Sequence, residues 1–270
     1  MSGLPQPADG DGDLPATDAS GAASGKTTGI LSLLYGLYAW LAFLVCVAGA
    51  ALSAMLLPGL ARRRRWVTRF ARMPFFLAGI RTTVNGGEHL PDTPCVVVAN
   101  HASYLDGVIL QAFLPPRFSY VIKGEVRKVP VVHFFLRRIG AHFVERFAAG
   151  AGARDARTLL RAADGGESLA FFPEGTFSAE PGLAAFRAGA FAAAQRAAIP
   201  VVPVVIRGAR HVLPAAHLLP RHGALTIDIL PPIPVDDSST SKQLAELARQ
   251  RILEVLAEPD LVLRRRQTAG

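Results

Sequence analysis

The chain has 270 residues, 50% of them hydrophobic and 19% charged, and its 29 Lys and Arg outnumber its 21 Asp and Glu to give a formal charge of +8. So apolar a composition excludes an intrinsically disordered protein and points to a membrane. Two cysteines are too few for a disulfide framework or a thiolate zinc site. The positive charge favours an anionic partner, with nucleic acid and anionic lipid as the candidates.

The first predicted elements are a disordered leader over residues 1–29 and a transmembrane helix over residues 30–57. The leader is rich in Gly, Pro, Ser, Asp and Ala, a composition that cannot bury a core. No charged residue and no histidine occurs between Thr27 and Ala61. As a helix, residues 30–57 would be about 42 Å long against a hydrocarbon core of about 30 Å, which allows one tilted span. A buried core helix is the alternative explanation.

A basic segment over residues 58–80 comes next. The consecutive arginines Arg62 to Arg65 follow the apolar run directly, and by the positive-inside rule they place everything after Leu60 in the cytoplasm. They act either as a stop-transfer cluster alone or also as a binding site for anionic lipid. Arginines and aromatic residues alternate from Trp66 to Gly79, which predicts a short interfacial helix that Pro74 should cut short.

Residues 81–260 are predicted to form one domain, in which apolar runs of strand character alternate with helical stretches. Because this alternation is typical of βα units, we expect an α/β fold with a mixed sheet flanked by helices. The predicted strands are Cys95–Ala99, Ser119–Ile122, His142–Glu145, Leu169–Phe172, Val201–Ile206 and Leu225–Leu230. The predicted helices are Leu105–Phe113, Pro130–Arg138, Ala153–Ala163, Arg187–Ala197 and Ser238–Leu256. Residues 261–270 are interpreted as a basic tail.

The first candidate site residues follow the strand that ends at Ala99. His101 and Asp106 are five residues apart, so they do not share a helix face, but they can meet if His101 precedes the helix and Asp106 lies in its first turn. The carboxylate would then bind one ring nitrogen and raise the basicity of the other, which can take a proton from a hydroxyl. A histidine with a purely structural role is the alternative.

The second group of candidates follows the strand that ends at Phe172. Pro173 and Gly175 force a turn that carries Glu174, either as a functional acid or as a solvent-facing side chain. Farther along, an apolar strand contains Pro200 and Pro203 and leads to Arg207. Proline inside a strand indicates an edge or a bulge, so this strand is interpreted as shaped for a site. Further cations lie between the first two groups, at Lys123, Arg137, Arg138 and Arg146.

Together these blocks resemble the glycerolipid acyltransferase family, whose best-known members are 1-acyl-sn-glycerol-3-phosphate acyltransferases. The first block of the family, NHxSxxD, is matched by Asn100, His101, Ser103 and Asp106. The second resembles Lys123, Gly124, Glu125, Gly140, Phe143, Val144, Glu145 and Arg146. The third resembles Phe172, Pro173, Glu174, Gly175 and Thr176, followed by Phe186, Gly189, Ala190 and Phe191. The fourth resembles Ile199, Pro200, Val201, Val202, Pro203 and Val204. The resemblance covers residues 100–208, in the family's order.

The resemblance implies acyl transfer from acyl-CoA or an acyl carrier protein to the free hydroxyl of a lysolipid such as 1-acyl-glycerol-3-phosphate, giving phosphatidic acid. It implies that His101 is the general base and that Asp106 orients it. The acceptor's glycerol or phosphate region would be held by Glu174, Gly175, Thr176, Arg146, Lys123, Arg187 and Arg207. Pro200 and Pro203 would border the acyl site. No metal and no cofactor are expected, and the acyl thioester is a co-substrate.

One position departs from the family pattern. The third block commonly continues with Arg after Thr176, whereas this chain has Phe177. The missing cation leaves open another acceptor, such as a lyso-ornithine lipid or a different lysophospholipid. A lipid-binding protein without turnover is the alternative from another class, and no nucleic-acid partner is expected, because the densest basic run adjoins the apolar segment. We expect a membrane protein of the bacterial inner membrane, with the catalytic domain on the cytoplasmic face.

Overall fold

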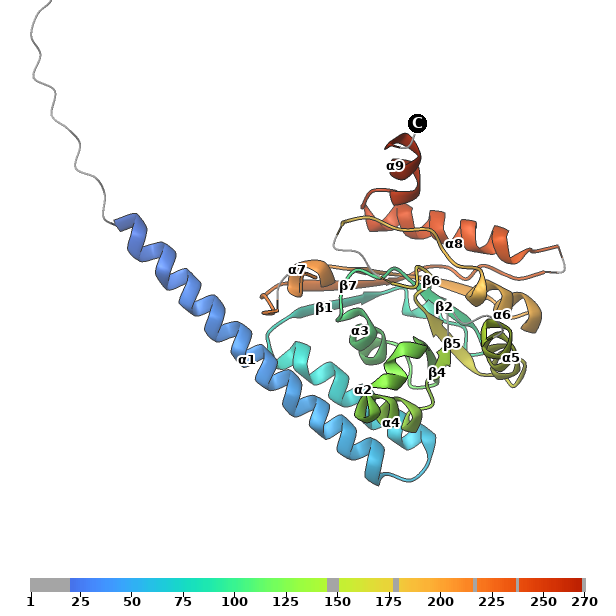
Figure 1. Cartoon of the computed structure of the whole chain (residues 1–270), viewed down its shortest axis with the longest axis horizontal. Helices are drawn as coiled ribbons and strands as arrows, with labels where there is room; N and C mark the ends of the chain where they lie inside the picture. Colours follow the sequence, from blue (N-terminus) through green and yellow to red (C-terminus); the bar gives the residue numbers. More distant parts are fainter. Residues whose placement is uncertain (1–19, 145–150, 177–179, 216–217, 237, 269–270) are drawn as a thin grey trace, which may run out of the picture.

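The structure is a computed structural model that describes residues 20–144, 151–176, 180–215, 218–236 and 238–268, without the side chains of residues 20–28, 151–157, 266 and 268. Its centre is a seven-stranded sheet in the order β1-β7-β6-β2-β5-β3-β4 (Figure 1). The strands are β1 Arg81–Asn85, β2 Val96–Ala99, β3 Phe118–Lys123, β4 His142–Val144, β5 Ser168–Phe171, β6 Val201–Arg207 and β7 Ala224–Ile229. Neighbouring strands are parallel except β6 and β7, which confirms the predicted mixed α/β sheet.

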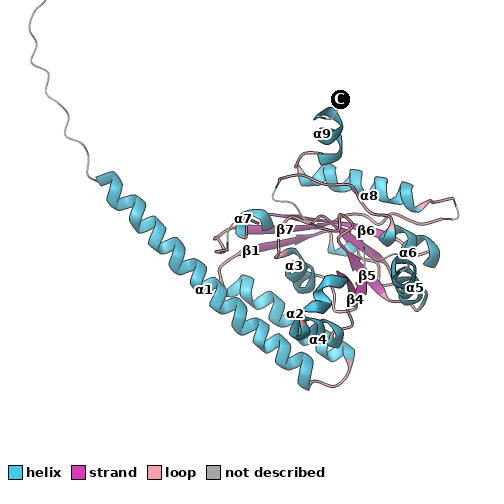
Figure 2. Cartoon of the chain, viewed as in Figure 1, coloured by secondary structure: helices cyan, strands magenta, loops and turns pink. Residues whose placement is uncertain are grey.

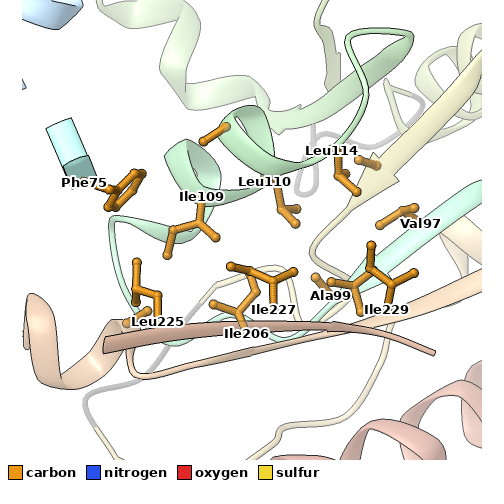
Figure 3. Packing of buried hydrophobic residues seen from close by; sticks show 14 of the residues in the cluster. Phe75, Val97, Ala99, Ile109, Leu110, Leu114, Ile206, Leu225, Ile227 and Ile229 are labelled. Atoms are coloured by element: carbon orange, nitrogen blue, oxygen red, sulfur yellow. The ribbon is translucent and has the colours of Figure 1, made fainter. Parts of the chain in front are cut away.

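Helices cover both faces of this sheet, as Figure 2 shows. They are α1 Ser20–Leu56, α2 Leu60–Leu77, α3 Asp106–Phe113, α4 Pro130–Arg138, α5 Ala151–Asp164, α6 Gly189–Ala197, α7 Ala209–Val212, α8 Ser241–Leu256 and α9 Leu261–Thr268. On one face Phe75 of α2 and Leu110 of α3 pack against strand residues such as Ile206 (Figure 3). On the other face α5, α6 and α8 pack against side chains such as Val98 and Leu169.

Several predicted boundaries change in the structure. The strand β1 was not predicted, because its sequence RTTVN is mostly polar, as suits an exposed edge strand. The predicted leader overlaps α1, which begins at Ser20, while residues 1–19 lie outside the described residues. Residues 261–268 of the predicted basic tail form the helix α9. That helix is attached to the domain because Leu261 is buried and Asp260 accepts the backbone N–H of Val262, 2.8 Å away.

The structure shows which of the two explanations for the prolines near β6, an edge strand or a bulge, is right. It is a central strand, so the edge alternative is wrong. Pairing with β7 joins Val204 to Ile229, whereas the next bridge joins Val201 to Ile233, so one extra residue lies on the β7 side. This register change is a bulge, and Pro203, whose carbonyl accepts the N–H of Leu230 at 2.9 Å, lies within it. The bulge accommodates the missing proline N–H inside the sheet.

Helices α1 and α2 form an antiparallel pair beside the domain (Figure 1). Among the described residues, only the helical stretch Gly29–Leu56 is long and apolar enough to cross a membrane. One side of α1 contacts the domain through Tyr35, whose hydroxyl donates to the Ala78 carbonyl at 3.0 Å, and through Met55, whose carbonyl accepts from Arg138 at 2.8 Å. Other side chains of α1, such as Leu41 and Leu44, are exposed.

The prediction that Pro74 ends the second helix is wrong. Helix α2 continues through Pro74 to Leu77, and the N–H of Ala78 donates to the Pro74 carbonyl at 2.9 Å. A proline disrupts the hydrogen bond to the carbonyl four residues earlier, here that of Phe70, but the N–H groups after it can still donate, so one further turn forms. Pro74 is itself buried, and α2 packs against α3 as well as α1.

The arginine run is also used differently from expectation, because Arg64 is buried in the domain. Its guanidinium donates to the carbonyl of Ile139 at 2.8 Å, to that of Arg117 at 3.1 Å and to the Ser119 hydroxyl at 2.6 Å. Burial lowers the pKa of Arg64, and the neighbouring Glu167 carboxylate partly offsets this effect. Binding of anionic lipid is therefore wrong for Arg64, which joins α2 to the sheet.

We expect Arg64→Met to destabilise the domain by at least about 3 kcal/mol, because buried acceptors would lose their donor. Arg65→Met is the matched control, since Arg65 is exposed on the same helix. Urea unfolding of the detergent-solubilised protein measures both variants. Equal losses of unfolding free energy would contradict a structural role specific to Arg64.

Candidate active site

The candidate site lies at the carboxyl edge of β2 and β5, which are parallel neighbours. One residue, Asn100, separates His101 from the end of β2, and Asp106 is the first residue of α3. The His101 Nδ1 lies 2.8 Å from the Asp106 Oδ2, so the predicted contact is confirmed. An ionised carboxylate can only accept a hydrogen bond. Nδ1 of His101 therefore carries the ring proton and donates it to Asp106, while Nε2 keeps its lone pair. Nε2 is the ring nitrogen that can act as a base.

Asp106 is fixed by more than the histidine. Its side chain is fully buried, and the same Oδ2 also accepts the backbone N–H groups of Ala102 at 2.6 Å and Ser103 at 2.8 Å. The sequence between histidine and aspartate therefore wraps around one oxygen atom. A carboxylate that accepts three hydrogen bonds is well suited to hold the imidazole in a single orientation.

Phe172 limits the movement of the His101 ring from the other side. The two rings are stacked with centroids 4.3 Å apart and an interplanar angle of 20°. The His101 side chain remains 19% exposed, so a substrate can still reach it. The sequence analysis placed Phe172 in the third block without a role. Its position directly before the Pro173 turn is the only signal that could have suggested one.

Glu174 is a buried side chain, so the solvent-facing alternative is wrong. The N–H of Gly175 donates to the Phe172 carbonyl at 3.0 Å, which closes the predicted turn, and Gly175 has a φ of +87° that favours glycine. Glu174 Oε1 accepts the backbone N–H of His101 at 2.7 Å, and Oε2 accepts that of Ala184 at 2.9 Å. Both carboxylate oxygens are thus used to hold backbone. Glu174 positions the histidine loop from β5.

Burial raises the pKa of Glu174, and the hydrogen bonds from Ala184 and His101 oppose this rise. A raised pKa means that the folded protein binds this proton more tightly than the unfolded chain, so the corresponding stability is lost as pH rises through the folded pKa. We expect wild type to lose unfolding free energy relative to Glu174→Gln as pH rises above the usual glutamate range. Urea unfolding of both proteins from pH 4 to pH 7 measures this, and a constant difference would contradict it.

Two residues of the first block, Asn100 and Ser103, have structural roles that the sequence analysis did not assign. The Asn100 side chain joins β2 to β6, accepting the N–H of Ile206 at 2.7 Å and donating to its carbonyl at 3.0 Å. The hydroxyl of Ser103 donates to the Leu213 carbonyl at 2.8 Å. Both side chains are buried, and they fix the two ends of the histidine loop to neighbouring segments.

Some of the predicted binding residues lie at the same edge of the sheet as His101. Lys123 ends β3, the neighbour of β5, and forms a 3.1 Å ion pair with Glu125. The N–H of Arg187 donates to the Pro173 carbonyl at 2.9 Å, and its side chain is exposed beside this turn, as is Thr176. Their contacts with an acceptor stay predictions.

Arg207 ends β6 at the same edge, directly after Ile206, which binds Asn100, and its side chain forms a 2.7 Å ion pair with Asp228 on the antiparallel neighbour β7. The predicted acyl-site residues lie farther along β6. Pro203 is inside the sheet, and Pro200 precedes β6 at the opposite edge, roughly 20 Å along the strand from Ile206, which pairs with Asn100. Arg146 and Phe177 lie outside the described residues. Within the described part of the chain, no group of three or more His, Cys, Asp or Glu side chains is placed to hold a metal ion.

The chain is similar to one protein family and to several known proteins. A family model described as Acyltransferase matches residues 81–207. A lyso-ornithine lipid O-acyltransferase of Pseudomonas aeruginosa is 30% identical over 250 residues, which cover 84% of this chain and 88% of that protein. A chloroplast 1-acyl-sn-glycerol-3-phosphate acyltransferase of Brassica napus is 31% identical over 184 residues, 67% of this chain. The chain spans 51% of the length of that plant protein.

A solved structure shares the fold. The crystal structure of the 1-acyl-sn-glycerophosphate acyltransferase of Thermotoga maritima superposes with a TM-score of 0.72 and is 24% identical in sequence. The match covers 85% of this chain and 96% of that one. His101 and Glu174 lie within the residues that the family model matches.

Proposed function

Because this chain belongs to the acyltransferase family, as its resemblance implied, we propose that it transfers a fatty acyl group from an acyl thioester to the free hydroxyl of 1-acyl-glycerol-3-phosphate. The observation that carries the proposal is the contact between His101 and Asp106, which leaves Nε2 of His101 as a base on a partly exposed ring. The thioester would come from acyl-CoA or an acyl carrier protein. A non-catalytic lipid-binding protein has no need for this pair.

The described residues support a direct transfer. His101 Nε2 removes the hydroxyl proton as the acceptor oxygen attacks the thioester carbonyl, and Asp106 stabilises the imidazolium that forms. The carbon–sulfur bond then breaks, and the leaving thiolate takes the proton from His101 to give a free thiol and the new ester. A thioester is already activated, so no covalent enzyme intermediate is needed. Glu174 and Phe172 hold the histidine loop in place throughout.

The charges near the site suit a phosphorylated acceptor. Lys123 ends β3, the parallel neighbour of β5, and Arg187 is bound through its backbone N–H to the Pro173 carbonyl in the turn after β5. Two cations at this edge of the sheet favour an anion there. Phosphate binding by Lys123 and Arg187 is therefore part of the proposal, with the lysolipid hydroxyl directed toward His101.

A second acceptor is favoured by a specific observation. The relative with the widest coverage among those described above is named for a lyso-ornithine lipid, and Phe177 stands where the family commonly has arginine. A lyso-ornithine lipid has no phosphate, so an enzyme built for it needs fewer cations. This acceptor is the alternative substrate.

A panel of acceptors separates the two. Purified protein is mixed with an acyl thioester and either lysophosphatidate or lyso-ornithine lipid, and thiol release is recorded with a colorimetric reagent. We expect release with lysophosphatidate and a much slower rate without the phosphate group. Release only with lyso-ornithine lipid would replace the proposed acceptor, and release with neither would refute the activity.

The proposed location is a membrane, with the domain on the cytoplasmic side, and two features support it. Helix α1 exposes a row of large apolar side chains, and arginines follow its end. The second feature is helix α4. All nine of its residues are described and none is buried, and its apolar side chains Val131 and Phe134 are 79% and 52% exposed. The α4 residue Arg138 binds the last carbonyls of α1, so α4 lies at the level where the apolar run ends.

We expect Val131→Asp to raise the KM for an acceptor embedded in vesicles about tenfold, the equivalent of the roughly 1.5 kcal/mol that burying a valine supplies. The KM for a short-chain, water-soluble acceptor should not change. Val84→Asp is the matched control, because Val84 is 41% exposed on the edge strand β1, away from α4. A KM for the vesicle-embedded acceptor that stays at its wild-type value in Val131→Asp, or that rises no more than the KM for the soluble acceptor, would argue against a membrane contact at α4.

A further inference from the structure

The backbone that holds Glu174 is itself held by the end of the chain. Ala184 donates its N–H to Glu174, and the residues before Ala184 pair with the segment that joins α8 to α9. The Leu183 N–H donates to the Pro259 carbonyl at 3.0 Å, and the Leu183 carbonyl accepts from the Leu261 N–H at 3.2 Å. The Gly182 N–H donates to the Glu258 carboxylate at 2.7 Å. These contacts form a short parallel bridge.

Arg249 of α8 binds both segments of this bridge. Its guanidinium donates to the Ala184 carbonyl at 3.0 Å and to the Leu183 carbonyl at 3.4 Å, and it forms an ion pair with Asp260. Arg249 is 5% exposed, and Leu183 is fully buried. Removing a buried arginine that binds two carbonyls and one carboxylate takes away the side-chain donor to Ala184, while the Leu183 carbonyl and Asp260 keep their bonds to backbone N–H groups.

The contacts connect Arg249 to the histidine in a few steps. Arg249 binds the carbonyl of Ala184, the N–H of Ala184 binds Glu174, and Glu174 binds the N–H of His101 at 2.7 Å. Arg249 and Asp260 lie outside the part of the chain that the family model matches, residues 81–207. Residues outside the four blocks therefore help to hold Glu174 of the third block.

We propose that Arg249, braced by Asp260, is a positioning residue for acyl transfer, which holds Ala184 against Glu174 and so fixes the histidine loop. Arg249 touches neither His101 nor the substrate site. The inference rests on the proposed function for its kinetic readout. It also predicts a purely structural readout, because without Arg249 the hydrogen bonds from Ala184 and His101 to Glu174 should open more often.

The test compares Arg249→Met with Arg196→Met in the full-length protein. Arg196 also forms an arginine–aspartate pair, with Asp164 at 3.7 Å, but it is exposed on α6. We expect Arg249→Met to lower kcat between about 10- and 100-fold with little change in the acceptor KM, as a misplaced base would. Arg196→Met should keep wild-type kinetics. Added to Glu174→Gln, the Arg249→Met change should cost little more, since both act on the same contact.

Hydrogen exchange of the same variants is the second readout. Peptides that contain His101 to Ser103 and Gly182 to Ala184 should exchange faster in Arg249→Met, while peptides from β3 keep their wild-type rate. If Arg249→Met does not fold, Asp260→Asn removes the ion pair and keeps a good cap for α9. Unchanged exchange around His101, or a kcat loss that multiplies with that of Glu174→Gln, overturns the inference. Faster exchange in a protein that transfers no acyl group would refute the proposed function and leave the positioning role supported.

Discussion

His101→Ala is expected to reduce kcat for acyl transfer by about 10²- to 10⁴-fold, the range typical for removal of a general base. The variant should still fold, because the His101 side chain is partly exposed and its contact with Glu174 uses the backbone N–H, which alanine keeps. The carboxylate of Asp106 would also keep the N–H groups of Ala102 and Ser103. The measurement is thiol release from an acyl thioester at saturating acceptor.

His133→Ala is the matched control, since His133 is a partly buried histidine on α4 that packs against Phe143, with ring centroids 4.8 Å apart. It should transfer acyl groups at the wild-type rate. Binding of lysophosphatidate vesicles should be the same in wild type and His101→Ala. Thiol release that persists undiminished in His101→Ala would refute general-base catalysis by this residue.

Two substitutions of Asp106, to asparagine and to alanine, are expected to have the same effect on kcat but different effects on the free energy of unfolding. The three hydrogen bonds from His101, Ala102 and Ser103 all reach Oδ2 of Asp106, so an asparagine can place its carbonyl oxygen there and keep accepting from Ala102 and Ser103. Asp106→Asn should therefore unfold nearly as wild type does and lose about 10²- to 10⁴-fold in kcat, because a neutral amide stabilises the His101 imidazolium poorly. The measurements are kcat and urea unfolding on the same preparations.

Asp106→Ala should show the same loss of kcat together with a loss of about 2–6 kcal/mol in unfolding free energy, since two buried N–H groups lose their acceptor. The difference in stability between the alanine and asparagine variants measures how much the loop depends on Oδ2. An alanine variant as stable as the asparagine variant would contradict the described role of these hydrogen bonds. An asparagine variant with wild-type kcat would contradict the orienting role of the carboxylate.

Local patterns were enough to predict most strands and helices. The apolar runs of β2, β5 and β6 were found because strands buried on both faces are almost entirely apolar, and α4 was predicted with the boundaries that the structure shows. Strand β1 was missed because an exposed edge strand does not need an apolar sequence. The end of α2 was misplaced because burial of Pro74 against the domain outweighs one missing hydrogen bond.

The amino-acid sequence by itself determined the α/β class, the apolar helix near the amino terminus and the pairing of His101 with Asp106, because each depends on residues close together in the chain. Only the tertiary structure decided the remaining roles. Arg64 reaches a carbonyl 75 residues away, the His101 N–H reaches a glutamate 73 residues away, and Arg249 reaches a carbonyl 65 residues away. Whether such a charge faces lipid, substrate or buried backbone depends on which distant segments fold against it, and no local pattern records that.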